Sequence, residues 1–153
     1  IDPVGTVINN ALSKNLACRK LAENSRILTA DTLVWFEGKL VGKPTDKDEA
    51  YRYLNAFSGK NQTVFTGVVY SYIDSDGKLV EKVRCEASLV KFKELNEEYI
   101  RKYIELVNPL DRAGAYDISD HGDLVVEKII GSRSNVIGLP MEIVVEMIDK
   151  NSN

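Results

Sequence analysis

Thr29-Ala30-Asp31-Thr32-Leu33-Val34-Trp35-Phe36 is the stretch that decides the fold of this chain. From Ile27 to Phe36 the residues are mostly apolar, β-branched or aromatic, and Glu37-Gly38 can turn the chain back, so a strand leading into a hairpin is predicted. Asp31 does not fit this pattern, because an ionised carboxylate in a half-buried strand is costly unless a metal, a donor or a cation compensates it. Asp31 is therefore a candidate site residue, and the alternative is an aspartate on the open face of an edge strand.

Hydrophobic periodicity on either side of this stretch alternates between helical and strand spacing. Helices are predicted over about 6–23, 46–57, 97–107 and from 140 onward, and strands over 62–73, 78–92 and 124–130. The first helix exposes Lys14, Arg19 and Lys20, which are interpreted as a solvated face. The turn Asp74-Ser75-Asp76-Gly77 predicts an antiparallel hairpin. Because helices and strands are interleaved, we expect an α/β or α+β domain built on a mixed β-sheet.

Composition limits the classes of function before any motif is considered. At 153 residues the chain is long enough for one ordinary domain, so we expect 1–153 to form a single domain. The formal net charge of −3 gives no basic field for a nucleic acid polymer or an anionic membrane surface, and no apolar run approaches membrane-spanning length. Cys18 and Cys85 have no metal-ligand spacing and predict reduced core thiols of a cytoplasmic protein.

Three polar clusters lie at the junctions of the predicted elements. Lys43 follows the hairpin that carries Asp31, so a cation and a carboxylate are expected to converge on one side of the sheet. The segment Asp111-Arg112-Ala113-Gly114-Ala115-Tyr116 surrounds one arginine with small residues, which lets backbone amides approach an anion. Gly131-Ser132-Arg133-Ser134-Asn135 is a similar turn. Each cluster alone is typical of an ordinary loop, but together with Asp31 they favour a phosphate site with a metal-holding acid.

At these residues the chain resembles a known family. Five motifs occur in the order and spacing of the Maf proteins: Thr29–Thr32, Val41–Pro44, Leu54–Gly59 followed by Thr66-Gly67-Val68, Asp111–Tyr116 and Gly131–Pro140. The resemblance covers nearly the whole chain, from about Ile27 to Met147. Maf proteins are nucleoside triphosphate pyrophosphatases, also described as septum formation inhibitors. The resemblance therefore implies a house-cleaning hydrolase of nucleotide metabolism with an elongated sheet and a central cleft, similar to inosine triphosphate pyrophosphatase.

The resemblance also implies roles for single residues. Asp31 matches the acid taken as the proton acceptor, which would activate water and help to hold Mg²⁺ or Mn²⁺. Lys43 matches a lysine that offsets phosphate charge, and Arg112 stands where the family usually has lysine. Thr32 matches the mark of the dTTP/UTP-cleaving branch, and Asn135 matches a position near the bound nucleotide. The implied reaction is hydrolysis between the α and β phosphates, which gives nucleoside monophosphate and pyrophosphate.

The chain also departs from the family pattern. The family opens with a strand and an Ala-Ser-x-Ser-Pro-Arg-Arg loop that grips the triphosphate; neither is in this chain, and we expect residues upstream of Ile1 to supply them. Asp2 corresponds to one acid of the family's acidic pair and is a second candidate metal ligand. Leu16-Ala17 stands at the family's active-site Lys-Ala pair, and Ser119 stands at a glutamine linked to base choice.

Three hypotheses are open at this point. The first is a metal-dependent pyrophosphatase that removes non-standard or surplus pyrimidine triphosphates, with a nucleoside triphosphate as its partner and a homodimer as one assembly. The second is a catalytically degenerate Maf-like protein that binds nucleotides or a division-related partner without hydrolysis. The third is a purely structural α/β domain, which a closed surface with no cleft beside Asp31 would favour.

Overall fold

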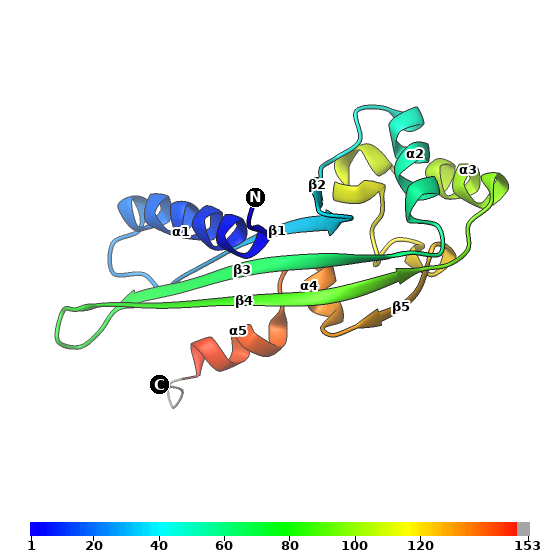
Figure 1. The fold of residues 1–153 in the computed structure, drawn as a ribbon. Helices are drawn as coiled ribbons and strands as arrows, with labels where there is room; N and C mark the ends of the chain where they lie inside the picture. The colour runs from blue at the N-terminus through cyan, green and yellow to red at the C-terminus, as the bar shows by residue number, and fades with distance from the viewer. Residues whose placement is uncertain (150–153) are drawn as a thin grey trace.

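The computed structural model describes residues 1–149, in which a long five-stranded sheet carries helices on both faces and at one end (Figure 1). The strand order is β2-β1-β3-β4-β5. The strands are β1 (Ile27–Phe36), β2 (Lys39–Val41), β3 (Asn61–Ile73), β4 (Leu79–Phe92) and β5 (Val126–Ile130). The expected α/β architecture with an elongated sheet is confirmed.

Every strand pairing within residues 1–149 is antiparallel, where we expected a mixed sheet. Parallel neighbours need a crossover that carries the chain back to the end of the sheet where the first strand began. The connection from β1 through β2 and α2 (Lys47–Phe57) instead stays at the end where β1 finishes (Figure 1). β3 therefore enters from that end and runs opposite to β1.

The helices begin and end close to the predicted positions, with two differences. They are α1 (Pro3–Leu21), α2, α3 (Glu97–Leu106), α4 (Arg133–Ile137) and α5 (Met141–Ile148), with the 3₁₀ turns η1 (Pro109–Asp111), η2 (Ala113–Ala115) and η3 (Gly122–Leu124). α1 begins earlier than predicted, because the Asp2 carboxylate accepts hydrogen bonds from the backbone amides of Val4 and Gly5, both at 3.1 Å. The polar turn expected before residue 136 forms α4, which Ser132 caps.

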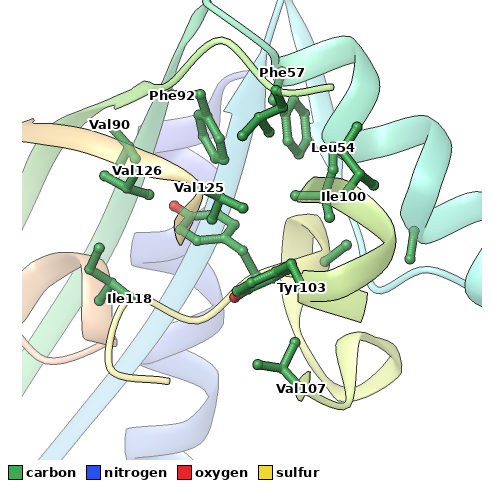
Figure 2. Close-up of a cluster of buried hydrophobic side chains, with 14 of the residues drawn as sticks. Leu54, Phe57, Val90, Phe92, Ile100, Tyr103, Val107, Ile118, Val125 and Val126 are labelled. Atoms are coloured by element: carbon green, nitrogen blue, oxygen red, sulfur yellow. The ribbon is translucent and has the colours of Figure 1, made fainter. Parts of the chain in front are cut away.

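The helices divide the hydrophobic core into two clusters. α1 lies on one face of the sheet and α4 and α5 on the other, while α2 and α3 lie together beyond one end (Figure 1). The larger cluster fills that end and includes Leu54, Phe57, Val90, Phe92, Ile100, Tyr103 and Val125 (Figure 2). A smaller cluster of Val68, Tyr70, Val144 and Met147 joins α5 to the sheet. The predicted apolar stripes of α2 and α3 are the faces that these helices bury. The apolar spacing in α1 does not mark its buried face, because Asn15 is buried while Leu16 is half exposed.

α1 contacts the sheet through backbone rather than through side chains at Gly67. A Cβ atom on Gly67 would lie 2.6 Å from the carbonyl carbon and oxygen of Val7, a distance that real Cβ atoms do not adopt. Glycine inside a strand often marks such a close approach of another backbone. Gly67 pairs directly with Asp31 in the β1–β3 register, so α1 passes over the strand aspartate.

Two further sequence expectations can be compared with the structure. None of the helices in residues 1–149 combines the length and the apolar character needed to cross a bilayer. Neither cysteine forms a disulfide. Cys85 is partly buried, but Cys18 lies exposed in the last turn of α1 and is not the core thiol that we expected.

Candidate active site

Asp31 lies in the middle of β1, on the sheet face that α1 covers. Its Oδ1 atom forms an ion pair with the Lys14 Nζ atom at 2.7 Å, and its Oδ2 atom accepts a hydrogen bond from the Asn10 amide at 2.9 Å. Only 19% of the Asp31 side chain is exposed. The strand aspartate therefore points neither to open solvent nor into an uncompensated apolar core, because a cation and an amide contact its two oxygens.

Sequence reasoning missed both partners of Asp31. We interpreted Lys14 as part of a solvated face and expected the position of the family's helix lysine to be held by Leu16, which is half exposed. The lysine that reaches Asp31 comes from position 14 of the same helix. Asn10 and Lys14 stand four residues apart and so share one helix face. That spacing was visible in the sequence, but the sequence did not show that this helix face lies against β1, because the contact of Val7 with Gly67 determines it.

Metal-binding capacity at this face depends on few protein groups. Within residues 1–149 no group of three histidine, cysteine, aspartate or glutamate side chains is placed to hold a metal ion. Asp2 is engaged as the N-cap of α1. Mg²⁺ at nucleotide sites is usually held by one or two carboxylates together with substrate phosphates and waters. Asp31 fits that mode as a partly exposed single ligand, so the residues present suit a metal that arrives with a triphosphate.

A cavity of about 190 Å³ lies beside Thr32 on the opposite face of the sheet. Successive side chains of a strand point to opposite faces, which separates Thr32 from Asp31. The Thr32 hydroxyl hydrogen-bonds with the Thr66 hydroxyl at 2.8 Å and donates to the carbonyl oxygen of Gly138 at 3.2 Å. The cavity is lined by Thr32, Val34, Val64, Asp111, Arg112, Ala113, Tyr116, Asp117, Ile118, Val136, Ile137 and Gly138. The cleft expected next to Asp31 is therefore present one residue further along, on the other face.

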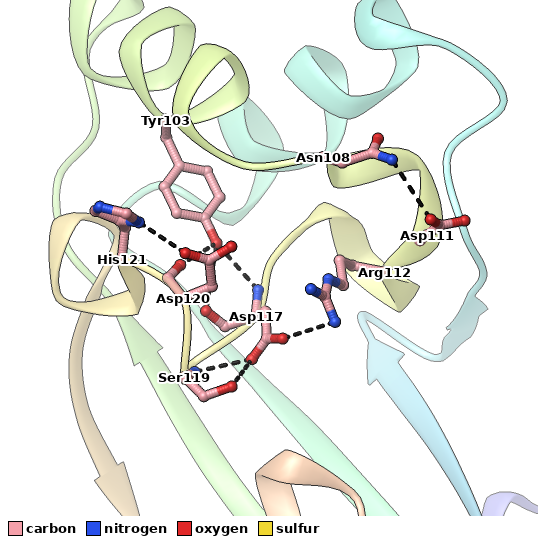
Figure 3. A network of polar contacts seen from close by, with 8 residues as sticks. All are labelled: Tyr103, Asn108, Asp111, Arg112, Asp117, Ser119, Asp120 and His121. Carbon is pink, nitrogen blue, oxygen red and sulfur yellow. Dashed lines mark hydrogen bonds and ion pairs between the residues drawn. The ribbon is translucent and has the colours of Figure 1, made fainter.

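Arg112 enters this cavity as part of a polar network (Figure 3). Its Nη1 atom forms an ion pair with the Asp117 Oδ2 atom at 2.8 Å, and its Nε atom is buried with no hydrogen-bond partner among the described residues. Ser119 donates to the Asp117 Oδ1 atom from its backbone amide at 2.8 Å and from its hydroxyl at 2.5 Å. Partial burial opposes ionisation of Asp117, but the Ser119 hydrogen bonds and Arg112 outweigh it and hold the Asp117 pKa below its usual value.

The remaining predicted residues, Lys43, Ser119 and Asn135, are not among those that line this cavity. Lys43 is exposed just after β2, and the Gly42 carbonyl oxygen beside it accepts a hydrogen bond from the Gly114 amide at 3.0 Å, which joins the Lys43 and Arg112 loops. Ser119 lines a neighbouring cavity of about 590 Å³. Asn135 is fully buried, and its side-chain amide donates to the Val64 carbonyl oxygen and the Ser88 hydroxyl, both at 3.0 Å. Asn135 thus ties α4 to the sheet behind the cavity.

The Maf-like protein family model matches residues 2–151. The chain belongs to the Maf family. Three relatives, each a dTTP/UTP pyrophosphatase, are similar over most of it. The protein of Thermosipho melanesiensis is 44% identical over 130 residues, which cover 85% of this chain and 68% of the relative. The protein of Dictyoglomus thermophilum is 42% identical over 142 residues, which cover 91% of this chain and 70% of the relative. The protein of Clostridium botulinum is 39% identical over 145 residues, which cover 94% of this chain and 76% of the relative.

Family membership connects the two faces described above. The match includes α1 with Lys14 as well as the segments around Thr32, Arg112 and Asn135, so both sets of residues lie within the Maf-like region. Maf-family pyrophosphatases generally act with divalent metal ions. Membership of the Maf family, with relatives named dTTP/UTP pyrophosphatases, counts against the structural-domain hypothesis, although the cavity lies on the face opposite Asp31.

Proposed function

We propose that this Maf protein is a nucleoside triphosphate pyrophosphatase that hydrolyses dTTP, UTP or a related non-standard nucleotide to the monophosphate and pyrophosphate. The activities for which its relatives are named support the substrate class. The observation that carries the proposal is the partly exposed Asp31 carboxylate with the Lys14 ammonium group 2.7 Å away. A carboxylate that is ionised and within reach of solvent can accept a proton from water.

In the proposed reaction, Asp31 accepts a proton from the water molecule whose oxygen forms a bond with the α-phosphorus. The bond between the α-phosphorus and the bridging oxygen breaks, and pyrophosphate leaves with that oxygen. Lys14 Nζ has three donors, of which one is directed to Asp31 and one to the carbonyl oxygen of Ala30 at 3.0 Å. The third donor is available to a phosphate oxygen, because 54% of the Lys14 side chain is exposed. A bound divalent metal would offset phosphate charge.

The nucleoside end of the substrate is proposed to occupy the cavity beside Thr32. Its volume of about 190 Å³ is smaller than the roughly 300–1,000 Å³ of pockets that enclose a whole ligand, so it accommodates only part of a nucleotide. β2 pairs only with residues 34–36 of β1, and no other described strand covers the outer edge of β1 at Asp31 and Thr32. A nucleotide that lies across this edge can contact both faces. Lys43, Arg112, Ser119 and Asn135 are proposed to act around it.

The finer features belong to the same proposal. The metal is Mg²⁺ or Mn²⁺, with Asp31 and Asp2 as candidate ligands. The protein acts as a single domain in the cytoplasm, alone or as a homodimer. Neither a nucleic acid polymer nor a membrane takes part.

The test is pyrophosphate release from a panel of nucleoside triphosphates with Mg²⁺ or Mn²⁺. Loss of a positioned general base typically lowers rates by about 10²–10⁴-fold, so Asp31→Asn should lower dTTP and UTP turnover by at least about a hundredfold. Asp76→Asn is a matched control, because Asp76 is exposed in the β3–β4 turn at the far end of the hairpin. Nucleotide binding by the wild-type protein without any pyrophosphate release would favour the degenerate, binding-only relative instead.

A further inference from the structure

We propose that Asn10 is a positioning residue for Asp31, which fixes the plane of the carboxylate so that one oxygen faces the attacking water. This inference rests on the proposed function and assigns a role to a residue that neither the motifs nor the family resemblance singled out. Its basis is that Lys14 and Asn10 bind different oxygen atoms of the same carboxylate. Lys14 binds the Oδ1 atom of Asp31 at 2.7 Å, and Asn10 binds the Oδ2 atom at 2.9 Å.

A carboxylate needs two such contacts to be held in one orientation. The terminal torsion of an aspartate side chain is broad and roughly two-fold, so the strand backbone alone does not fix the plane of the two oxygens. Lys14 contributes a compact charge on a long flexible stem, which can follow either oxygen. Asn10 has a short side chain with a directional amide, and its hydrogen bond specifies which oxygen faces position 10 and which one faces Lys14. Asn10 therefore supplies the constraint that Lys14 cannot.

The position of Asn10 follows from the approach of α1 to Gly67. Val7 of α1 touches the Gly67 backbone, and Gly67 is the register partner of Asp31. Asn10 and Lys14 follow Val7 by one and two helical turns, and both lie on the side of the helix that faces Asp31 of β1. Ala11, between them, is fully buried and receives the Thr29 hydroxyl on its carbonyl oxygen at 2.8 Å. The helix is thus held firmly enough for a short side chain to reach a fixed oxygen.

A purely structural role for Asn10 would make its replacement lower thermal stability, whereas a positioning role makes it lower turnover. Asn10 is exposed in the interior of α1, where asparagine forms helix less readily than alanine. Replacing it with alanine should therefore leave thermal stability unchanged or raise it slightly. Asn9 offers a matched control, because it is the same residue type and is exposed on the same helix. Its side chain makes no hydrogen bond to another residue in the described part of the chain. Any loss confined to position 10 must come from the contact with Asp31.

The experiment compares full-length wild-type, Asn10→Ala, Asn10→Asp and Asn9→Ala proteins in steady-state hydrolysis of dTTP and UTP with Mg²⁺ or Mn²⁺. Small misplacements of a catalytic group cost up to about a hundredfold, so Asn10→Ala should lower kcat by about ten- to a hundredfold, with KM changed much less. Asn10→Asp should lose at least as much, because a second carboxylate repels Asp31. Asn9→Ala should keep the wild-type kcat. Both alanine variants should keep or raise Tm.

A second measurement reads the contact without turnover. The side-chain amide resonance of Asn10 should shift in Asp31→Ala, while that of Asn9 should not. A wild-type kcat in Asn10→Ala, a loss that merely follows a lower Tm, or an unmoved Asn10 resonance would overturn the role of Asn10. A wild-type protein that releases no pyrophosphate from any nucleotide would overturn the proposed function itself, and the catalytic role of Asn10 with it.

Discussion

At the scale of single residues, Gly67 determines whether Asp31 has its partners. The side chains that bind Asp31 belong to α1, and α1 reaches them only because position 67 carries no Cβ atom. A helix that lay further from the sheet would leave the carboxylate without its cation. The residue that makes the site possible is thus a glycine on the neighbouring strand rather than a residue with chemistry of its own.

Gly67→Ala should therefore lower both stability and turnover. Overpacking a well-packed interior typically costs about 1–3 kcal/mol, and the clash is with Val7 backbone that cannot rotate away. Urea unfolding should show this loss, and pyrophosphate release should fall because Asn10 and Lys14 move away from Asp31. Gly42→Ala is the stability control, since a Cβ atom there meets nothing within 4 Å. Equal unfolding midpoints for the two variants would contradict this account.

At the scale of elements, α3 holds the loop that shapes the cavity. The Tyr103 hydroxyl accepts a hydrogen bond from the Asp117 amide at 3.0 Å and lies within 3.4 Å of the Asp117 carbonyl oxygen (Figure 3). A buried donor left without a partner costs about 1–3 kcal/mol, so Tyr103→Phe should lower the free energy of unfolding by that amount. Chemical denaturation at neutral pH measures it. A Tyr103→Phe protein as stable as the wild type would mean that the loop is held by its other contacts.

The same tyrosine predicts a loss of stability at high pH. Burial raises the Tyr103 pKa to about 12, whereas an unfolded tyrosine ionises near about 10. Because the folded-state value is the higher one, this contribution to stability is complete below about pH 10 and is lost as pH rises toward about 12. The stability of the wild type relative to Tyr103→Phe should therefore shrink between these values. A difference that stays constant over this range would contradict it.

Elements with strong local patterns were predictable from the sequence, and elements set by distant contacts were not. The stripe of Leu54 and Phe57 lies within α2, the turn at Asp74 joins two strands that follow each other in the chain, and both are found. The start of α1 depends on Asp2 acting as a cap, and α4 depends on Ser132, so short polar segments were assigned as loops. The antiparallel order depends on where the connections run, which periodicity does not record.

The site was predictable in its members and not in its arrangement. Asp31 stood out because a charge is costly in a strand. The motifs could not tell that Thr32 and Arg112 line a cavity on the face opposite Asp31, since this requires knowing which helix covers which face. Lys14 carries no signal of its own among other exposed lysines. Its role follows from the path of α1 over Gly67.

At the scale of the whole molecule, the sheet separates the two parts of the proposed site. Lys14 lies on the α1 face, and Thr32 bonds to the α4–α5 turn on the other face. Among residues 1–149 the side chains of Lys14 and Thr32 share no hydrogen-bond partner. Mutations at such sites usually combine additively, whereas residues that share a network couple. Because the two residues lie on opposite faces, we expect mutation of Lys14 to affect the reaction at the phosphates and mutation of Thr32 to affect binding of the nucleoside.

Lys14→Met should lower kcat, because removing one charged donor from a reacting group typically costs about 10²–10³-fold.

Thr32→Val removes only a hydroxyl from the cavity and should mainly raise KM. Independent sites add within about 0.3–0.5 kcal/mol, so kcat/KM of the double variant should equal the product of the single effects within about twofold. Lys20→Met and Thr63→Val are matched controls on α1 and β3. Effects that fail to multiply would mean that the two faces act as one network, with the edge of β1 flexing as the nucleotide binds.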